Sequence, residues 1–249
     1  MNDVAIAAQG PDEAGHSEID RAMHLLRPSE YTAALIQALH QMQSHVRGAS
    51  VLELGTGSGV VLAALGKLGA ARLCGVDVEE DALVSSRKLM GMVGLSERCE
   101  FCSGDMWAPV EGRRFDLVVA NLPHFPTERG DFPGRLVSWS DGGPDGRRLL
   151  DPFLRGLGAH LRPGGRAVIT HNAFVDIDRT HEMLAAQGLV ARILNTVMLP
   201  LPQEKLCRMT HSVRVAEEDR SVHQLGPYVF IEMHLIEIAA AASLSDIAA

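Results

Sequence analysis

Three glycines at alternate positions lie in the segment Glu53-Leu54-Gly55-Thr56-Gly57-Ser58-Gly59. An apolar run precedes this loop and a helical pattern follows it, so the chain turns sharply and exposes backbone N–H groups at a helix N-terminus. Such a turn binds a polar or anionic ligand. Dinucleotide loops have the spacing G-x-G-x-x-G, but here the third glycine comes one residue early, at Gly59, and Val60 follows. The spacing therefore disfavours the alternative of an NAD-dependent oxidoreductase.

Two acidic residues follow the next two apolar runs. Asp77 comes about 20 residues after Gly55, at a distance from which a carboxylate can reach both hydroxyls of a ribose. Asp105 lies in Ser103-Gly104-Asp105-Met106-Trp107, where a carboxylate can accept from an exocyclic amino group while Met106 or Trp107 packs on the ring. Acids at successive strand ends beside a glycine loop predict an adenosine-type ligand.

The segments that must position these residues alternate between strand and helix patterns. This alternation predicts a doubly wound α/β fold with a mostly parallel, seven-stranded sheet. In the last predicted strand apolar residues alternate with Glu232 and His234, which favours an antiparallel strand wetted on one face. The predicted strands are 50–54, 72–76, 99–102, 115–120, 166–170, 190–197 and 228–238. The first predicted helix begins at Ser29 and ends before Gly48. The other predicted helices span 60–68, 79–93 and 149–161.

Composition limits the classes of protein that remain. The chain has 249 residues, of which 46% are hydrophobic, enough for one large α/β domain. We expect a flexible N-terminal extension at 1–20, the main domain at 21–238 and an Ala-rich tail at 239–249. The net charge of −8 makes extended nucleic-acid binding unfavourable, and we expect Arg113-Arg114 and Arg147-Arg148 to be solvated loop charges.

Neither a membrane segment nor a metal site is predicted. No run of eighteen apolar residues occurs, and the first twenty residues lack the basic and apolar regions of a signal peptide, so we expect a cytoplasmic protein. Cys99 and Cys102 have C-x-x-C spacing, but positions i and i+3 of a strand point to opposite faces. We therefore expect both to be small buried core residues.

These motifs resemble the class I S-adenosylmethionine-dependent methyltransferases over roughly residues 20–238. The segment 51–59 is similar to the first motif of that family, Gly75-Val76-Asp77 to the second and Gly104-Asp105 to the third. The resemblance implies a Rossmann-like fold and S-adenosyl-L-methionine as cofactor. It also implies that the loop and the Glu53 region hold the methionine part, Asp77 the ribose hydroxyls and Asp105 the adenine amino group. The expected cofactor-binding residues are Glu53, Gly55, Thr56, Gly57, Gly59, Asp77, Val78, Asp105, Met106 and Asn121.

A narrower resemblance is to the branch that contains glutamine N5-methyltransferases and N6-adenine methyltransferases. That branch has N-P-P-Y after its fourth strand, whereas this chain has Asn121-Leu122-Pro123-His124, which matches at the first and third positions. The segment 26–32 is similar to the P-R-P-x-T-E segment of the branch, and 142–146 to its G-G-x-D-G loop. The resemblance implies methyl transfer to a nitrogen of a small molecule or protein side chain.

The expected catalytic residues are Asn121, Pro123 and His124. An amide or aryl amine is a poor nucleophile, and the Asn121 side-chain oxygen and the carbonyl of residue 122 can accept its N–H hydrogens and orient its lone pair. His124 replaces an aromatic ring and can stack, take a proton or cap a turn, which leaves O-methylation of a small molecule as an alternative. A non-catalytic protein that binds an adenosyl ligand is another. Phe125, Arg135 and Trp139 are candidates for shaping the substrate pocket.

Overall fold

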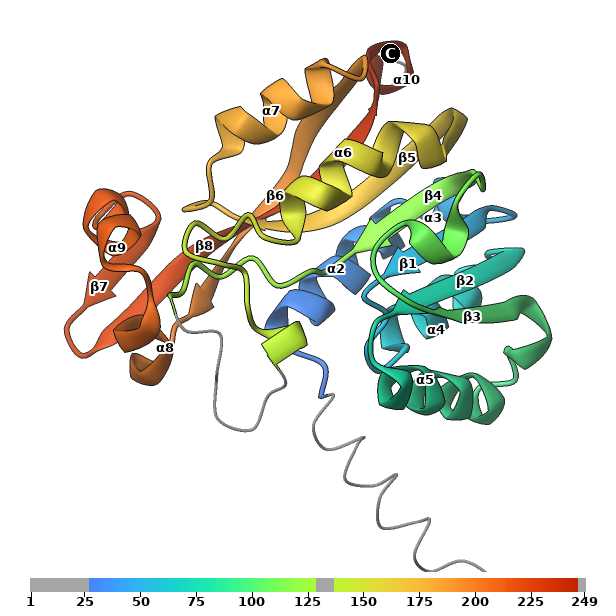
Figure 1. The fold of residues 1–249 in the computed structure, drawn as a ribbon, viewed down its shortest axis with the longest axis horizontal. Coiled ribbons are helices and arrows are strands. Elements are labelled where there is room, and N and C mark those ends of the chain that lie inside the picture. Colours follow the sequence, from blue (N-terminus) through green and yellow to red (C-terminus); the bar gives the residue numbers. More distant parts are fainter. Residues whose placement is uncertain (1–26, 129–136, 246–249) are drawn as a thin grey trace, which may run out of the picture.

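The computed structural model describes residues 27–128 and 137–245 (Figure 1). Within these ranges the strands form one eight-stranded sheet. The predicted N-terminal extension, residues 1–20, lies outside the described residues. The strands are β1 Ser50–Leu54, β2 Arg72–Asp77, β3 Cys99–Ser103, β4 Phe115–Ala120, β5 Leu161–Asn172, β6 Leu189–Pro200, β7 Val222–Leu225 and β8 Tyr228–Ala240.

The strand order is β3-β2-β1-β4-β5-β8-β6, and β7 pairs with the first residues of β8. The neighbouring strands from β3 to β5 are parallel, while β8 runs antiparallel to β5 and to β6. The predicted doubly wound, mostly parallel sheet with an antiparallel last strand is confirmed, and β7 extends it. The chain moves outward in both directions from β1 and β4, and the carboxyl ends of these two strands form the topological switch point where ligands bind in such sheets.

Helices fill the crossovers between strands. Helix α4 contacts α2 and α5, these three helices contact β1, β2, β3 and β5, and α6 contacts α7. Because crossovers between parallel strands are right-handed, the helices on the two sides of the switch point cover opposite faces. The helices are α2 Glu30–Gln41, α3 Gln43–Val46, α4 Val60–Lys67, α5 Glu80–Met92, α6 Leu150–His160, α7 Ile177–Ala185, α8 Gln203–Arg208, α9 His211–Glu217 and α10 Ala241–Ser245.

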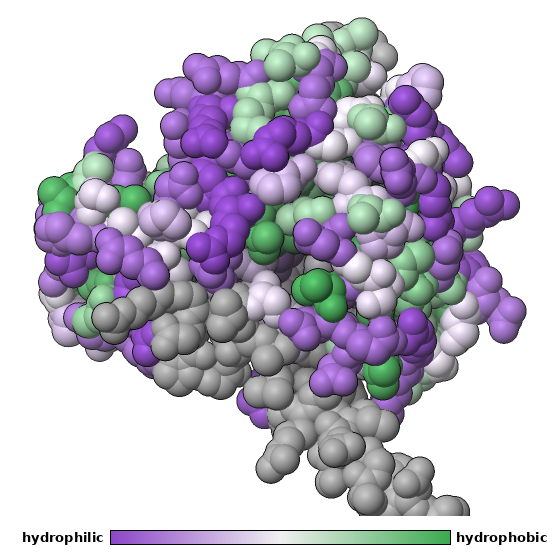
Figure 2. All heavy atoms as spheres, viewed as in Figure 1, coloured by the Kyte–Doolittle hydropathy of each residue, from purple (hydrophilic) through white to green (hydrophobic). Residues whose placement is uncertain are grey.

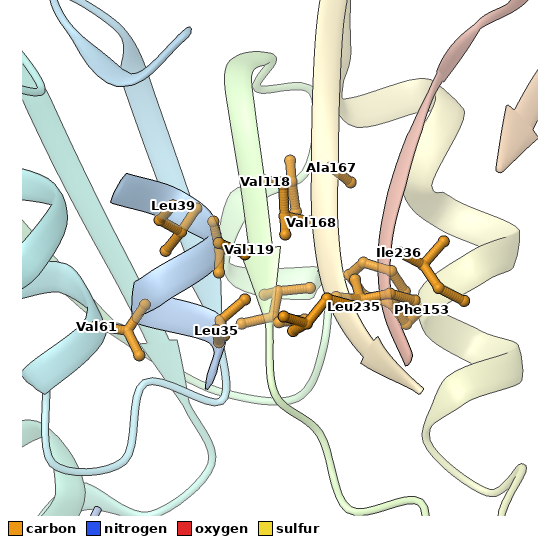
Figure 3. Packing of buried hydrophobic residues seen from close by; sticks show 14 of the residues in the cluster. Leu35, Leu39, Val61, Val118, Val119, Phe153, Ala167, Val168, Leu235 and Ile236 are labelled. Atoms are coloured by element: carbon orange, nitrogen blue, oxygen red, sulfur yellow. The ribbon is translucent and has the colours of Figure 1, made fainter. Parts of the chain in front are cut away.

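The core lies between the helices and the central strands. Figure 3 shows Leu35 of α2 and Phe153 of α6 directed toward the strands, and Val118 of β4 and Val168 of β5 belong to the same buried cluster. All four side chains are fully buried. Because β1 and β4 have buried residues on both faces, their sequences are nearly continuous apolar runs. This packing fixes the strand ends from which the loops at the carboxyl edge emerge.

The structure departs from the predicted elements mainly in its C-terminal half. Strand β5 starts at Leu161 rather than 166, with an irregular register before Arg166, and β8 continues to Ala240 before α10 begins. Helices α7, α8 and α9 and the four-residue strand β7 have no counterpart among the predicted elements. Along the chain the segment from α8 to β7 connects β6 to β8, and in Figure 1 it lies at the left end of the molecule, where β7 pairs with the first residues of β8.

Two predictions about burial were wrong. Cys99 and Cys102 are only half-buried, because β3 is an edge strand of the sheet. Arg147 is buried rather than solvated: its Nε donates to Asp151 Oδ1 at 2.7 Å and its Nη1 donates to Thr180 Oγ1 at 2.7 Å. The guanidinium therefore joins the loop before α6 to α7.

On the face of the molecule shown in Figure 2, hydrophilic residues predominate and hydrophobic residues are scattered among them. None of the described helices is long and apolar enough to cross a bilayer. Within residues 27–128 and 137–245 no group of three or more His, Cys, Asp or Glu side chains is arranged to hold a metal ion.

Candidate active site

A cavity of about 570 Å³ opens at the carboxyl edge of the sheet, within the size range of small-molecule sites. Its walls come from the ends of β1 to β4, the first residues of α2 and the turn η3, Val137–Trp139. We call this the first cavity. The predicted cofactor residues that line it are Glu53, Gly55, Thr56, Gly57, Asp77, Val78, Asp105, Met106 and Asn121.

The glycine loop adopts a backbone that only glycine accepts readily. Gly55, Gly57 and Gly59 all have positive φ, and the Gly55 and Thr56 N–H groups donate to Val76 O, which ties the loop to the end of β2. A Cβ at Gly57 would meet nothing within 4 Å, so the loop backbone faces open space there. This cradle and the carboxylates beside it fit an adenosyl ligand.

Gly59 has a different role from the predicted one. It is not among the residues that line the first cavity, and a Cβ on it would lie 2.7 Å from Ser86 Oγ and 3.0 Å from Ser86 Cα. Ser86 in turn donates from Oγ to Gly57 O at 3.0 Å. Gly59 therefore permits the close approach of α4 to α5 that supports the loop.

We predict that Gly59→Ala lowers the free energy of unfolding by about 2–4 kcal/mol, the sum of a left-handed backbone penalty and the clash with Ser86. Gly164→Ala is the matched control, because Gly164 also has φ near +77° but a Cβ there meets nothing within 4 Å. Its expected cost is about 1–2 kcal/mol. Urea unfolding measures both values, and equal losses for the two variants would contradict the role given to Ser86.

Asp77 is fixed by backbone donors at the end of β2. Its Oδ2 accepts from Gly57 N at 2.8 Å and its Oδ1 accepts from Glu79 N at 3.0 Å. Burial raises the pKa of this carboxyl above its ordinary value, and the two backbone N–H groups partly offset the effect. Asp77 is thus both a wall of the first cavity and a brace for the glycine loop. Asp105 also lines this cavity, but it is exposed.

Glu53 is a fully buried acid in the wall of the same cavity. Burial raises its pKa to about 8, although Thr56 Oγ1 donates to its Oε2 at 3.0 Å and favours the ionised form. The nearby Asp77 carboxylate raises the pKa further. Without a ligand, the folded protein therefore holds Glu53 largely protonated at neutral pH. A cationic ligand in the cavity would favour its ionised form.

The raised pKa of Glu53 makes the free energy of unfolding depend on pH. Between the ordinary pKa of about 4.5 and the folded value of about 8, the folded state binds one more proton at Glu53 than the unfolded state. The contribution of Glu53 to the free energy of unfolding is therefore complete below pH 4.5. It is lost as pH rises toward 8, by up to about 1.4 kcal/mol per pH unit. We expect Glu53→Gln to flatten this decline in ligand-free protein, as measured by urea unfolding at pH 5, 6.5 and 8. An equal slope in both proteins would contradict the assignment.

Asn121 is held between two threonines. Its Oδ1 accepts from Thr170 Oγ1 at 2.8 Å, and its Nδ2 donates to Thr32 Oγ1 at 3.5 Å. Thr170 comes from β5 and Thr32 from α2, so three elements fix the amide plane. An amide oxygen has two lone pairs, and Thr170 uses only one of them. The second is available to an N–H group of a ligand.

His124 is buried and neutral. Desolvation lowers its pKa to about 4. Its Nδ1 lies 2.5 Å from Leu122 O, and because a carbonyl can only accept, Nδ1 carries the proton and Nε2 is an acceptor. Nε2 has no hydrogen-bond partner among the described residues. His124 does not line the first cavity but lines a neighbouring one.

This neighbouring space, the second cavity, has a volume of about 370 Å³. It shares Asn121, Leu122 and Pro123 with the first cavity, as well as Ser29 and Trp139. The rest of its wall is formed by residues 199–202 at and after the end of β6 and by Glu30, Tyr31, His124, Phe125, Ser140, Asn172, Lys205 and Ile231. Asn121 therefore stands at the boundary between a space suited to the cofactor and a smaller space suited to an acceptor.

Several of these residues were not predicted as site residues from the sequence. Thr170 and Asn172 carry no local motif and reach the site through the sheet topology, while Thr32 is the last residue of the segment similar to P-R-P-x-T-E. Tyr31 was noticed only as part of the segment similar to P-R-P-x-T-E. Its hydroxyl donates to Asn172 Oδ1 at 2.7 Å, and its ring meets the His124 ring edge-on with centroids 5.9 Å apart. Phe125 and Trp139 do line the second cavity as predicted, whereas Arg135 lies outside the described residues.

The doubly wound sheet and the cavity at its switch point define a Rossmann-like cofactor-binding protein. The model of the ribosomal protein L11 methyltransferase family (PrmA) matches residues 30–123. A Methanocaldococcus jannaschii protein named "Putative protein N5-glutamine methyltransferase" is 30% identical over 164 residues, covering 65% of this chain and 80% of the relative. The chain therefore belongs to the class I S-adenosylmethionine-dependent methyltransferases, and S-adenosyl-L-methionine is its methyl donor.

Two further proteins are similar to this chain. The release factor glutamine methyltransferase of Moorella thermoacetica is 32% identical over 151 residues, and the chain spans about half of that relative, 52% of its length. The solved Mtq2–Trm112 complex of E. cuniculi, described as methylating the eRF1 termination factor, has a TM-score of 0.57 at 20% identity, covering 86% of this chain and 98% of that chain. The latter similarity supports the fold.

Proposed function

We propose that this enzyme methylates a nitrogen atom of a protein side chain or small molecule, and that a carboxamide of the glutamine type is the acceptor. The observation that carries the proposal is the position of Asn121, whose Oδ1 is fixed by Thr170 at the boundary of the two cavities. The glutamine methyltransferases among the relatives support the same acceptor chemistry.

The cofactor supplies a methyl group that its sulfonium already activates. The chain must then hold the acceptor nitrogen in line with the methyl group and exclude water. Asn121 Oδ1 accepts a hydrogen bond from one N–H of the substrate amide. The carbonyl of Leu122 accepts from the other N–H through the lone pair not used by His124. These two hydrogen bonds turn the nitrogen lone pair toward the first cavity.

Methyl transfer to the amide changes two bonds and releases one proton. A nitrogen–carbon bond forms as the carbon–sulfur bond breaks, its electron pair passes to sulfur, and the acceptor nitrogen loses one proton. His124 Nε2 is an unprotonated acceptor in the wall of the second cavity and is a candidate to receive that proton. Its pKa of about 4 makes it a weak base, which gives little support to the alternative in which His124 activates a hydroxyl for O-methylation.

The test is product analysis with two probes, N-acetyl-L-glutamine methylamide and an O-methylation substrate of similar size, N-acetyl-L-glutamic acid methylamide. We expect methylation of the carboxamide nitrogen, located by tandem mass spectrometry, with release of one S-adenosylhomocysteine per methyl group. Methylation of the carboxylate alone would favour the O-methyltransferase alternative. Tight binding of S-adenosylmethionine without transfer to either probe would favour a non-catalytic binding protein.

A further inference from the structure

A buried hydrogen-bond donor lies at the boundary of the two cavities without a partner. The indole Nε1–H of Trp139 is shielded from solvent and has no hydrogen-bond partner among the described residues. Trp139 lines both cavities. Native structures pair nearly all buried N–H groups, so an unpaired donor in a cavity wall points to a ligand that accepts a hydrogen bond there.

The turn that carries this indole is anchored. Ser138 Oγ donates to Glu79 Oε1 at 2.6 Å, next to the N-terminus of α5. After the turn, Gly142 packs so closely on the backbone of His124 and Phe125 that a Cβ on it would lie 2.6 Å from Phe125 O. Trp139, whose side chain lines both cavities, is therefore held between two fixed points.

Several other polar groups of the second cavity have partners or are acceptors. The Tyr31 hydroxyl donates to Asn172 Oδ1, and Asn172 Nδ2 donates to His124 O at 3.4 Å. Asn121 Oδ1 and Leu122 O each keep an unused lone pair. A ligand that complements this wall has N–H groups for the two acceptors and a hydrogen-bond acceptor for Trp139.

We propose that Trp139 donates its indole N–H to the carbonyl oxygen of an acceptor carboxamide in the second cavity. The inference rests on the proposed function and adds a specificity-determining residue to it. A carboxamide has two N–H donors and one carbonyl oxygen, the complement of Asn121, Leu122 and Trp139. An amine lacks the carbonyl oxygen and leaves Trp139 unpaired, so this hydrogen bond selects carboxamides over amines.

The hydrogen bond acts on binding rather than on the chemical step. A donor at the carbonyl oxygen draws electron density away from the nitrogen, so it orients the amide without making the nitrogen more nucleophilic. Trp139→Phe keeps an aromatic ring but removes the N–H together with the five-membered part of the indole. We expect it to raise KM for N-acetyl-L-glutamine methylamide about tenfold, with kcat changed by less than about threefold.

The chain offers an internal spectroscopic control, because it has two tryptophans. Trp107 Nε1 already lies 3.2 Å from Pro152 O and from Phe153 O, so its indole N–H is satisfied. Proton–nitrogen correlation spectra of full-length protein saturated with S-adenosylhomocysteine therefore contain a reporter and a reference, assigned with Trp139→Phe. Adding N-acetyl-L-glutamine methylamide is expected to move the Trp139 indole proton downfield and leave the Trp107 proton unchanged. N-acetyl-L-ornithine methylamide, which has an amine, is expected to move neither.

Three results would overturn the inference. A downfield shift of the Trp139 proton on adding S-adenosylhomocysteine alone would assign the donor to the cofactor. Nitrogen methylation of the carboxamide with the same KM in wild type and Trp139→Phe would remove Trp139 from acceptor binding but leave the proposed function standing. No nitrogen methylation of the carboxamide by the wild type would overturn the proposed function and this inference together.

Discussion

Replacing Asn121 by alanine is expected to lower kcat for methyl transfer by about 10²–10³-fold, while the Kd for S-adenosylmethionine changes by less than about tenfold. The variant removes the oxygen that fixes the acceptor N–H, so the lone pair of the nitrogen is no longer held toward the methyl group. Most of the cofactor contacts predicted here come from other residues of the first cavity. Single-turnover assays and calorimetric titration separate the two quantities.

Thr170→Val tests whether the orientation of Asn121 matters as well as its presence. Valine has a similar shape but cannot donate to Asn121 Oδ1, so we expect a loss in kcat of about tenfold with Asn121 intact. Thr196→Val is the matched control, because Thr196 is exposed on β6 and contacts His234 rather than either cavity. Wild-type turnover by Asn121→Ala would refute the role given to this motif.

The parts of the site that local sequence predicted are those at strand ends. A parallel strand buried on both faces is a nearly continuous apolar run, so β1 and β4 could be delimited at both ends. The functional residues then lie at the end of the strand or directly after it, as Glu53 does in β1 and Asn121 does after β4. Positive φ at Gly55 and Gly57 explains why glycine occurs at alternate positions between β1 and α4.

The acceptor side could not be predicted in this way because distant segments build it. Tyr31 and Asn172 form a hydrogen bond across 141 positions of sequence, and Thr170 reaches Asn121 only because β5 pairs with β4. No spacing rule links these residues before the strand order is known. The burial of His124 is a similar case: its sequence position suggested a stacking ring or a base, while its neutral state depends on the packing around it.

The short elements of the C-terminal half could not be predicted from the sequence for a different reason. Helices α8 and α9 have six and seven residues, too few for an apolar period to stand out from a loop. Strand β7 has four residues and is stabilised by pairing with β8 rather than by its own pattern. Helix α7, with nine residues, has two buried positions, Thr180 and Leu184, and the first of these is polar.

Asp77→Ala is expected to raise the Kd for both S-adenosylmethionine and S-adenosylhomocysteine by about 100-fold or more. Two effects add. The variant removes the carboxylate predicted to accept from both ribose hydroxyls, and it leaves the Gly57 and Glu79 N–H groups without their acceptor, which loosens the glycine loop. Because the two ligands share the ribose, the ratio of their affinities should be preserved. Asp105→Ala, at an exposed position, should cost only about tenfold.

Calorimetric titration with both adenosyl ligands and with NAD measures these losses. Asp116→Ala is a suitable control, since Asp116 Oδ2 accepts from Ser50 N at 2.8 Å at the start of β1, away from the carboxyl edge. It should affect stability but not ligand affinity. Unchanged affinity in Asp77→Ala would mean that the ribose lies elsewhere in the first cavity. A loss confined to one adenosyl ligand would show that Asp77 acts near the methyl group instead, because sulfur and its methyl are where the two ligands differ.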